Sequence, residues 1–300
     1  MRSSHTSKLI ARIKGGLGNQ LFCYAAARRL ALVNNAELVI DDVTGFVRDR
    51  QYRRQYALDR FHITARRATA AERLEPLERY RRGLAKFVAR NRPFYLCRYV
   101  EQEGFDFDRR LLDFKINGTV YIDGYWQSEN YFKDVEQTIR EDLRIIPPED
   151  TLNQDMAKSL SQCNAVAVHV RWFDPPGNET TQRNMSANYY HRAVAEIEQK
   201  VSNPHFFLFS DDSAAAKRLL NIPEERITCM DHNRGDENAC ADLWLMTQCK
   251  HFIIANSSFS WWGAWLGGDR EKVIITPDLE INGKTARGVK GLIPNAWVRI

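Results

Sequence analysis

The sequence predicts an α/β fold with two doubly wound parallel sheets, and three observations support this prediction. Residues 165–170 form a run of valine and alanine that ends in one histidine and one valine; it is too short for an independent helix and typical of a strand buried in a parallel sheet. Short apolar segments alternate with helix-like segments along both halves of the chain. A proline-containing linker at 145–150 separates these halves. We therefore expect one domain over 1–150 and a second over 151–300, which face each other across a cleft.

Composition places the chain among ordinary soluble proteins. Its 300 residues are 44% hydrophobic, which is enough for a sizeable core. The net charge of +5 favours an anionic ligand and by itself leaves nucleic acid possible. The six cysteines form no C-x-x-C pair, which favours reduced thiols. The first eight residues lack the apolar core of a signal peptide, and no segment has the roughly 18 consecutive apolar residues of a membrane span, so we expect a cytoplasmic protein.

Each half has its own series of elements. In the first half we predict a strand at 9–13, a glycine-rich loop at 14–20, a helix at 21–32, a strand at 37–40, a strand entering an aromatic loop at 120–127 and a helix at 132–143. In the second half we predict strands at 165–170, 206–209, 252–254 and 273–275, helices at 188–200 and 236–249, and an apolar helix after residue 258. Glycines before a helix let backbone amides approach an anionic ligand closely.

The first loop has an alternative interpretation. Gly16-Leu17-Gly18 matches half of the dinucleotide-binding fingerprint, and Asp41 and Asp42 lie at about the right distance for its ribose-binding carboxylate. Leu21 occupies the place of the third glycine and would push the helix away from the strand. A dinucleotide-dependent oxidoreductase is therefore a second, less favoured hypothesis.

Segment 44–98 is rich in arginine, and its sequence predicts secondary structure less clearly than the rest of the chain. Its apolar residues between Ala70 and Phe87 have helical spacing. The arginines could bind acidic glycans or membrane headgroups, so peripheral membrane association stays open. A solvated helix face is the commoner explanation of such a run, and we expect that here.

Polar residues follow the buried strands of the second half. His169, Arg171 and Asp174 come at the end of one strand, and Asp211 and Asp212 at the end of the next. Ligands bind beyond the carboxyl ends of strands in open α/β sheets. The planar fork of an arginine suits a phosphate, although an arginine–aspartate ion pair closing the turn is an equal alternative. The paired aspartates could accept from guanine or ribose groups, or could cap the next helix.

A third polar group precedes the apolar helix after residue 258. Asn256, Ser257 and Ser258 bring hydroxyls and backbone amides to a helix N-terminus, which predicts a phosphate cradle or, alternatively, ordinary N-capping. Asp106 and Asp108 have the spacing of a metal-binding Asp-x-Asp, but a basic, helix-like segment follows, and we interpret the pattern as chance. No metal site is predicted.

Five motifs together resemble the α-1,2-fucosyltransferases. They are residues 15–22 (GGLGNQLF), 123–129 (DGYWQSE), the His169-x-Arg171-x-x-Asp174 motif, 209–212 (FSDD) and 256–263 (NSSFSWWG). The motifs run in order through nearly the whole chain. The His-x-Arg motif is weak alone, whereas the glycine-asparagine-glutamine loop and the asparagine-serine-tryptophan block are highly specific.

This resemblance implies a two-domain glycosyltransferase of the GT-B type. Such an enzyme would move L-fucose from GDP-fucose to the 2-hydroxyl of a terminal β-galactoside, with inversion and without a metal or other cofactor. Its acceptor would be a galactose-terminated oligosaccharide or a lipid-linked glycan, with no nucleic-acid partner. A fucosyltransferase of other linkage or acceptor, and a catalytically silent sugar-nucleotide binder, remain alternatives.

The resemblance also implies roles for individual residues. Arg171 would bind the β-phosphate, and Ser257 and Ser258, flanked by Asn256 and Phe259, would contact phosphate. The loop of Gly16, Gly18 and Asn19 would close over the sugar nucleotide. The guanosine would be surrounded by His169, Asp211 and Asp212. We choose Asp174 as the general base, with Asp41 and Asp42 as second choices. Trp172, Phe173 and Pro175 depart from the usual His-Val-Arg-Arg-Gly-Asp-Tyr pattern, which makes this loop bulkier and stiffer.

Overall fold

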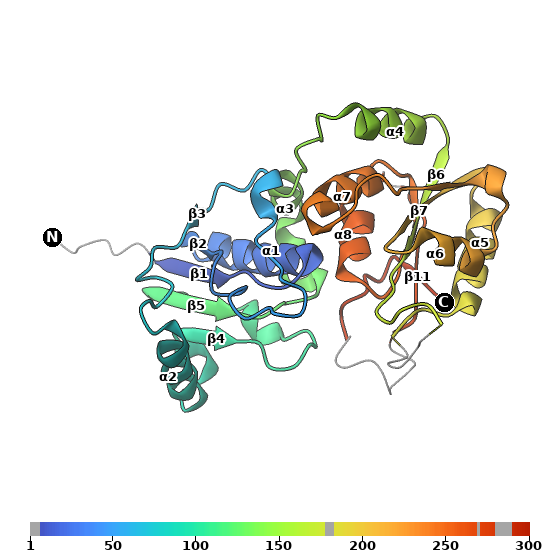
Figure 1. The fold of residues 1–300 in the computed structure, drawn as a ribbon. Coiled ribbons are helices and arrows are strands. Elements are labelled where there is room, and N and C mark those ends of the chain that lie inside the picture. Colours follow the sequence, from blue (N-terminus) through green and yellow to red (C-terminus); the bar gives the residue numbers. More distant parts are fainter. Residues whose placement is uncertain (1–6, 178–182, 269–270, 280–289) are drawn as a thin grey trace. The chain divides into compact units, whose positions relative to one another are not determined.

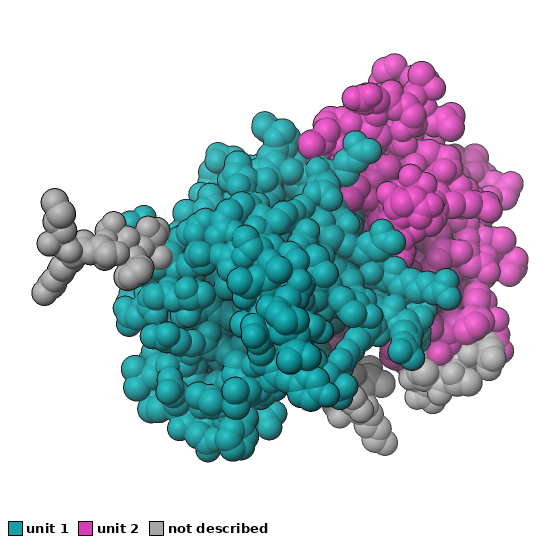
Figure 2. Space-filling model, turned by 60° about the vertical axis from the view of Figure 1, so that its left-hand side comes forward, with its two compact units in different colours: residues 1–144, 288–292 teal, residues 145–287, 293–300 magenta. Residues whose placement is uncertain are grey.

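The computed structural model describes residues 7–177, 183–268, 271–279 and 290–300. The chain forms two compact units, which Figure 2 distinguishes by colour. Unit 1 consists of Met1–Arg144 and Gly288–Leu292, and unit 2 of Ile145–Arg287 and Ile293–Ile300. The expected division into 1–150 and 151–300 did not include this return of a late segment to unit 1. Ser128 Oγ donates a hydrogen bond of 2.5 Å to the carbonyl of Gly291, which fastens that segment.

Unit 1 contains a five-stranded parallel sheet in the order β3-β2-β1-β5-β4 (Figure 1). The strands are β1 (Lys8–Arg12), β2 (Glu37–Asp41), β3 (Arg66–Arg67), β4 (Tyr99–Glu101) and β5 (Thr119–Asp123). The helices are α1 (Leu17–Val33), α2 (Glu78–Arg90) and α3 (Glu136–Asp142). The expected helix at 132–143 is instead a short 3₁₀ turn at Lys133–Val135 followed by α3.

Helix α1 begins four residues earlier than the sequence indicated. Gly18 and Asn19 therefore lie in its first turn and not in a loop. The side chain of Gln20 makes this possible, because its Nε2 donates to the carbonyls of Gly15 and Gln55, and its Oε1 accepts from the amide of Ala57. These bonds hold the chain before α1 against the segment that follows β2. The loop is therefore shorter than expected.

Unit 2 contains a six-stranded parallel sheet in the order β11-β10-β9-β6-β7-β8. The strands are β6 (Asn164–Val170), β7 (Pro204–Ser210), β8 (Ile227–Cys229), β9 (His251–Ile253), β10 (Ile274–Thr276) and β11 (Val298–Arg299). The helices are α4 (Thr151–Ser161), α5 (Ala187–Lys200), α6 (Ser213–Leu220), α7 (Ala239–Thr247) and α8 (Ser258–Leu266). Residues 165–168 are completely buried, as a central strand of a parallel sheet requires.

Several smaller features complete the fold. Helices α7 and α8 pack against each other, and Trp261, Trp262 and Trp265 of α8 are buried in the core of unit 2. None of the six cysteines, all of which lie in the described segments, forms a disulfide bond. Among the helices of the described segments, none has both the length and the apolar character needed to cross a membrane.

Candidate functional site

The polar residues of unit 2 gather at one edge of its sheet. Strand β6 pairs in parallel with both β7 and β9, so the carboxyl ends of all three strands meet at that edge. The register sets Val170 opposite Ser210 and Val168 opposite Ile253. The segments that follow these strands carry most of the predicted site residues, which is the usual place for a ligand in such a sheet.

Arg171 and Asp211 form an ion pair at this edge. The guanidinium Nη1 lies 2.9 Å from a carboxylate oxygen of Asp211, and the amide of Trp172 donates to the other oxygen. About a third of the Arg171 side chain is exposed, so it remains accessible to an anionic ligand. The sequence left open an arginine–aspartate ion pair that closes the turn after β6. The structure has an ion pair, but the aspartate, Asp211, follows the neighbouring strand β7.

The other two aspartates have different positions. Asp212 caps α6 by accepting a hydrogen bond of 2.9 Å from the amide of Ala215, which is the alternative expected for it. Asp174 is 5% exposed. Its amide donates to Asn184 Oδ1 and its carbonyl accepts from Asn184 Nδ2, which fixes the loop after Arg171.

His169 is a buried neutral imidazole. It is 6% exposed, and burial, assisted by the positive charge of Arg171, lowers its pKa to about 3. Its ring lies 5.6 Å from the ring of Phe259 on α8. Among the described residues, its Nδ1 is one of a few buried side-chain atoms without a hydrogen-bond partner. A buried polar atom of this kind is costly unless a ligand or water satisfies it.

Asn256 and the serines lie at the N-terminus of α8. Asn256 Nδ2 donates to the carbonyl of Arg183, while its buried Oδ1 has no partner within the residues that the structure covers. Ser257 occupies the N-cap position, but its side chain makes no capping hydrogen bond, and the first turn holds no acidic residue. Ser257 thus offers these backbone amides no side-chain acceptor, and amides at a helix N-terminus favour an anion.

These features of unit 2 suit an anionic ligand with a polar, neutral part. Arg171 and the start of α8 can bind phosphate oxygens, since both present donors with positive charge. His169 and Asn256 offer unsatisfied polar atoms to groups that are not charged. A diphosphate attached to a nucleoside combines both kinds of group.

In unit 1 the structure brings two of the sequence motifs together. Asn19 Oδ1 accepts a hydrogen bond of 2.6 Å from Gln127 Nε2, and Cys23 Sγ donates to the carbonyl of Gly124. Gly15 has φ +78°, and a Cβ there would lie 3.0 Å from Asn19 Nδ2, so only glycine fits. The glycine-asparagine-glutamine loop and the aromatic loop after β5 thus form one structural group.

Arg54 is a neighbour of this group that the sequence did not indicate. A Cβ built on Gly16 would lie 3.7 Å from the guanidinium carbon of Arg54, so the two are close in space. Gly16 is the N-cap of α1 and provides no side-chain cap, and the first turn has no acidic residue. Because 38 residues separate Arg54 from Gly16, no local pattern could have linked them.

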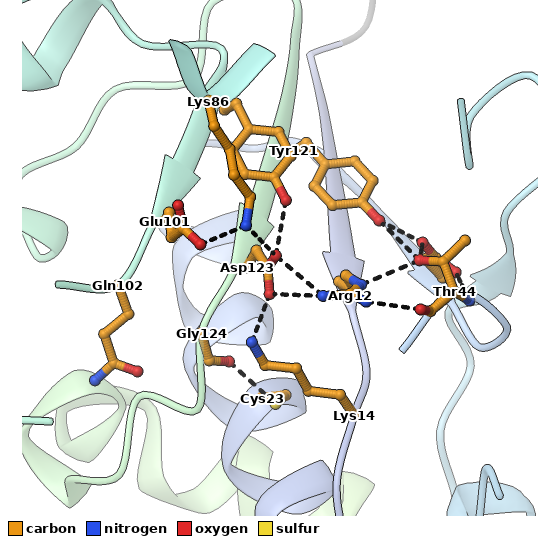
Figure 3. Close-up of polar contacts among 12 residues, drawn as sticks. Arg12, Lys14, Cys23, Thr44, Lys86, Glu101, Gln102, Tyr121, Asp123 and Gly124 are labelled. Carbon is orange, nitrogen blue, oxygen red and sulfur yellow. Dashed lines mark hydrogen bonds and ion pairs between the residues drawn. The ribbon is translucent and has the colours of Figure 1, made fainter. Parts of the chain in front are cut away.

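A buried charge network occupies the carboxyl ends of β1, β2 and β5 (Figure 3). The Asp123 carboxylate lies 3.2 Å from Arg12 and 2.6 Å from Lys14, with Lys86 at 3.6 Å. Burial alone would raise the pKa of Asp123, but Lys14 and Arg12 outweigh it and hold that pKa below its usual range. Asp123 therefore stays ionised and ties three segments together.

The alternative bases of unit 1 are held in structural contacts. Asp41 is fully buried and accepts from the amide and hydroxyl of Thr44 and from the hydroxyl of Tyr121. Asp42 lies 3.6 Å from Arg67 in an ion pair. Asp41 is therefore engaged in buried contacts, whereas Asp42 keeps about a quarter of its side chain exposed beside Arg67.

The Asp-x-Asp segment shows no metal-binding geometry. Asp108 caps a 3₁₀ turn and pairs with Arg110 at 2.7 Å, while Asp106 accepts from the amide of Lys290. Within the described part of the chain, no three histidine, cysteine or acidic side chains are grouped as a metal site.

The two parallel-sheet domains give the chain the fold of the GT-B glycosyltransferases. The chain belongs to glycosyl transferase family 11, whose model matches residues 9–290. It is 29% identical to an α-1,2-colitosyltransferase of Escherichia coli, over 98% of this chain and 99% of that protein. It is 28% identical to the O-antigen biosynthesis glycosyltransferase WbnK of Escherichia coli, over 88% of this chain and 92% of that protein.

Solved structures agree with the fold. The α-1,6-fucosyltransferase NodZ soaked with GDP-fucose is 15% identical, with a TM-score of 0.52 over 87% of this chain and 93% of that one. Fucosyltransferase NodZ from Bradyrhizobium is likewise 15% identical, with a TM-score of 0.51 over 86% of this chain and 92% of that one. The predicted fold class is thereby confirmed, and so is the family resemblance.

Proposed function

We propose that this glycosyltransferase moves L-fucose from GDP-fucose to the 2-hydroxyl of a terminal β-galactoside, with inversion and without a metal ion. The observation that carries the proposal is the position of two features of unit 2 that suit an anion. Arg171, partly exposed at the end of β6, and the N-terminus of α8, where Ser257 makes no side-chain cap, follow neighbouring strands. The α-1,2 linkage is supported by the relative named as an α-1,2-colitosyltransferase.

The reaction is one displacement at the anomeric carbon. A bond forms from the acceptor oxygen to this carbon while the bond to the β-phosphate oxygen breaks, and GDP leaves with the electron pair. Arg171 and the amides at Ser257 and Ser258 would stabilise the charge that develops on the leaving diphosphate. Arg171 would exchange part of its contact with Asp211 for phosphate oxygens, because one guanidinium can serve both.

The nucleoside would use the neutral polar atoms of the same site. We assign His169 and Asn256 to the guanosine or ribose, because their unpartnered atoms can donate or accept without charge. Asp211 would continue to orient Arg171, and Asp212 would hold α6 in place. The acceptor proton would pass to Asp174, which lies in the same loop as Arg171.

The direct experiment measures GDP release from GDP-fucose with a panel of β-galactosides, followed by NMR of the product. We expect turnover, an α-1,2 linkage and inverted configuration. A colitose nucleotide is the second donor to compare, because of the colitosyltransferase relative. Preference for the colitose donor would correct the sugar and keep the reaction class. No turnover with either donor, or a retained configuration, would contradict the proposal.

Metal independence is tested in the same assay. Activity should survive EDTA, because a guanidinium and helix amides take the place that a divalent cation has in other transferases. Loss of turnover with EDTA and recovery with Mg²⁺ or Mn²⁺ would show that a cation takes part.

Asn19 provides a further test. We propose that Asn19 acts on the transition state and that GDP is bound by other residues, chiefly Arg171 and the start of α8, so Asn19→Ala should lower kcat and leave GDP affinity nearly unchanged. Gln127→Ala is the matched variant, because it removes the hydrogen bond from Gln127 to Asn19 and keeps Asn19 itself. A loss of GDP affinity in Asn19→Ala with unchanged kcat would instead make Asn19 part of the nucleotide site.

A further inference from the structure

Helix α2 of unit 1 presents apolar side chains to solvent. Leu77, Tyr80, Leu84 and Phe87 are each more than 60% exposed. Tyr80, Leu84 and Phe87 are spaced by four and three residues and form one apolar stripe along α2, while Leu77 is the N-cap residue before it. No residue of α2 is buried, and its apolar contacts with the core cluster beside β4 come from the small residues Ala85 and Ala89 (Figure 1). Arg79, Arg81 and Arg90 of α2 are exposed, as expected of a solvated face, but the sequence did not indicate that large apolar side chains would be exposed beside them.

The same segment is strongly basic. Residues 77–98 contain six arginines and one lysine but a single acidic residue, Glu78. At 100° per residue, Arg79 and Arg90 lie along one side of the apolar stripe and Arg81 along the other. Long arginine side chains can keep their charge at a polar boundary while their carbon atoms cover apolar surface. The arrangement is that of a helix lying in a membrane interface.

A cavity of about 670 Å³ adjoins the apolar stripe. Its lining includes Leu84 and Val88 of α2 and, on the sheet, Ile10 and Tyr121. Arg98 belongs to the same lining. Leu84 is both exposed on the stripe and part of the cavity wall, so the apolar surface continues from the helix into the cavity.

We propose that α2 and this cavity dock unit 1 on an anionic lipid bilayer. The stripe enters the boundary between headgroups and acyl chains, the flanking arginines contact lipid phosphates, and the cavity admits the end of an acyl chain. The positive charge of this surface argues against a second copy of the chain as its partner. Two faces that each carry this excess of arginine would repel each other, whereas an anionic membrane is complementary to them.

The test is flotation of the full-length protein with vesicles of phosphatidylcholine alone and with vesicles containing one quarter phosphatidylglycerol. We expect binding to the anionic vesicles only, and weaker binding in high salt. The double variant L84S/F87S and the double variant R79Q/R90Q should each lower the partition coefficient by about tenfold or more. Leu152→Ser is the matched control, because Leu152 is 66% exposed on α4 of unit 2.

Thermal unfolding of each variant shows whether it is folded. We expect folded variants, because the replaced side chains are exposed. The proposal is overturned if the wild type does not bind anionic vesicles, or if L84S/F87S binds as well as the wild type. A wild-type dimer that L84S/F87S converts to a monomer, without vesicle binding, would identify a second copy as the occupant. None of these readouts depends on the sugar donor, so failure here is separate from failure of the proposed reaction.

Discussion

Arg171 combines partial exposure with a partner, Asp211, from the neighbouring strand. Asp211 fixes the direction of the guanidinium before a ligand arrives, so little side-chain freedom is lost on binding. Such preorganised positive charge is most effective against a charge that develops during the reaction. The identity of the side chain should therefore matter more than its charge.

We predict that Arg171→Lys lowers kcat/KM by about 10²-fold and Arg171→Ala by more, since lysine keeps the charge and loses the bidentate fork. Steady-state transfer and GDP titration of the same samples measure the effect. Arg110→Lys is the matched control, because Arg110 pairs with Asp108 of unit 1, outside the proposed site. Near-normal turnover in Arg171→Ala would remove Arg171 from the mechanism.

His169 should make stability depend on pH. Its pKa is about 3 in the folded protein and about 6.5 in an unfolded chain, so between these values only the unfolded state takes up the proton. This contribution is complete above pH ~6.5 and declines as the pH falls, by up to ~1.4 kcal/mol per pH unit. Urea unfolding at pH 7.5 and pH 5 should show a larger loss for the wild type than for His169→Phe. Equal losses would mean that His169 charges freely in the folded state.

At the scale of elements, the carboxyl ends of β1 and β5 are held by one carboxylate. Asp123 faces the cations of Arg12, Lys14 and Lys86 while it is only 1% exposed. Removing its charge leaves three cations near a buried site without their common partner. Sheet packing alone would not keep this many like charges together.

We predict that Asp123→Asn lowers the free energy of unfolding by about 3 kcal/mol at neutral pH. Asp123 has a depressed pKa, so its contribution is present above pH ~4 and is lost as the pH falls through the folded-state value. The variant should therefore approach the wild type in acid. Asp155→Asn is the control, because the Asp155–Lys158 pair is 71% exposed at both ends and should matter little. Equal effects of the two substitutions would contradict a structural role for the network.

At the scale of the molecule, the chain returns to unit 1 after it has built most of unit 2. Gly291 has φ +86°, and a Cβ there would lie 2.9 Å from Cβ of Phe107. Together with the bond from Ser128, this packing makes a late segment part of the first unit. The stability of unit 1 thus depends on residues far away in the sequence.

We predict that Gly291→Ala destabilises unit 1 by about 2 kcal/mol, because backbone strain and a steric clash act together. Gly118→Ala is the matched control: Gly118 has φ +73° and no atom within 4 Å of the added Cβ, so only the strain of ~1 kcal/mol remains. Denaturant unfolding of both variants measures the difference. Equal losses would show that the contact with Phe107 relaxes at no cost.

The sequence by itself determined the two parallel sheets, because runs such as 165–170 can be buried only as central strands. It also determined which polar residues gather at one edge of the sheet of unit 2, since the carboxyl ends of parallel strands share an edge. The motifs in the sequence were sufficient to indicate the family. Local patterns placed Asn19 in a loop, however, because the bonds that extend α1 come from Gln20 to residues 35 and 37 positions later.

Only the tertiary structure decided which charges pair. The acceptor of Arg171 is Asp211 of the next strand and not Asp174, because parallel strands bring together residues that are far apart in sequence. Asp41 accepts hydrogen bonds from Tyr121, which is 80 positions away, as well as from the nearby Thr44. The sequence also did not determine that the apolar stripe of α2 is exposed. A periodic apolar pattern indicates that side chains share one face of a helix, but only the packing against the sheet decides whether that face is covered.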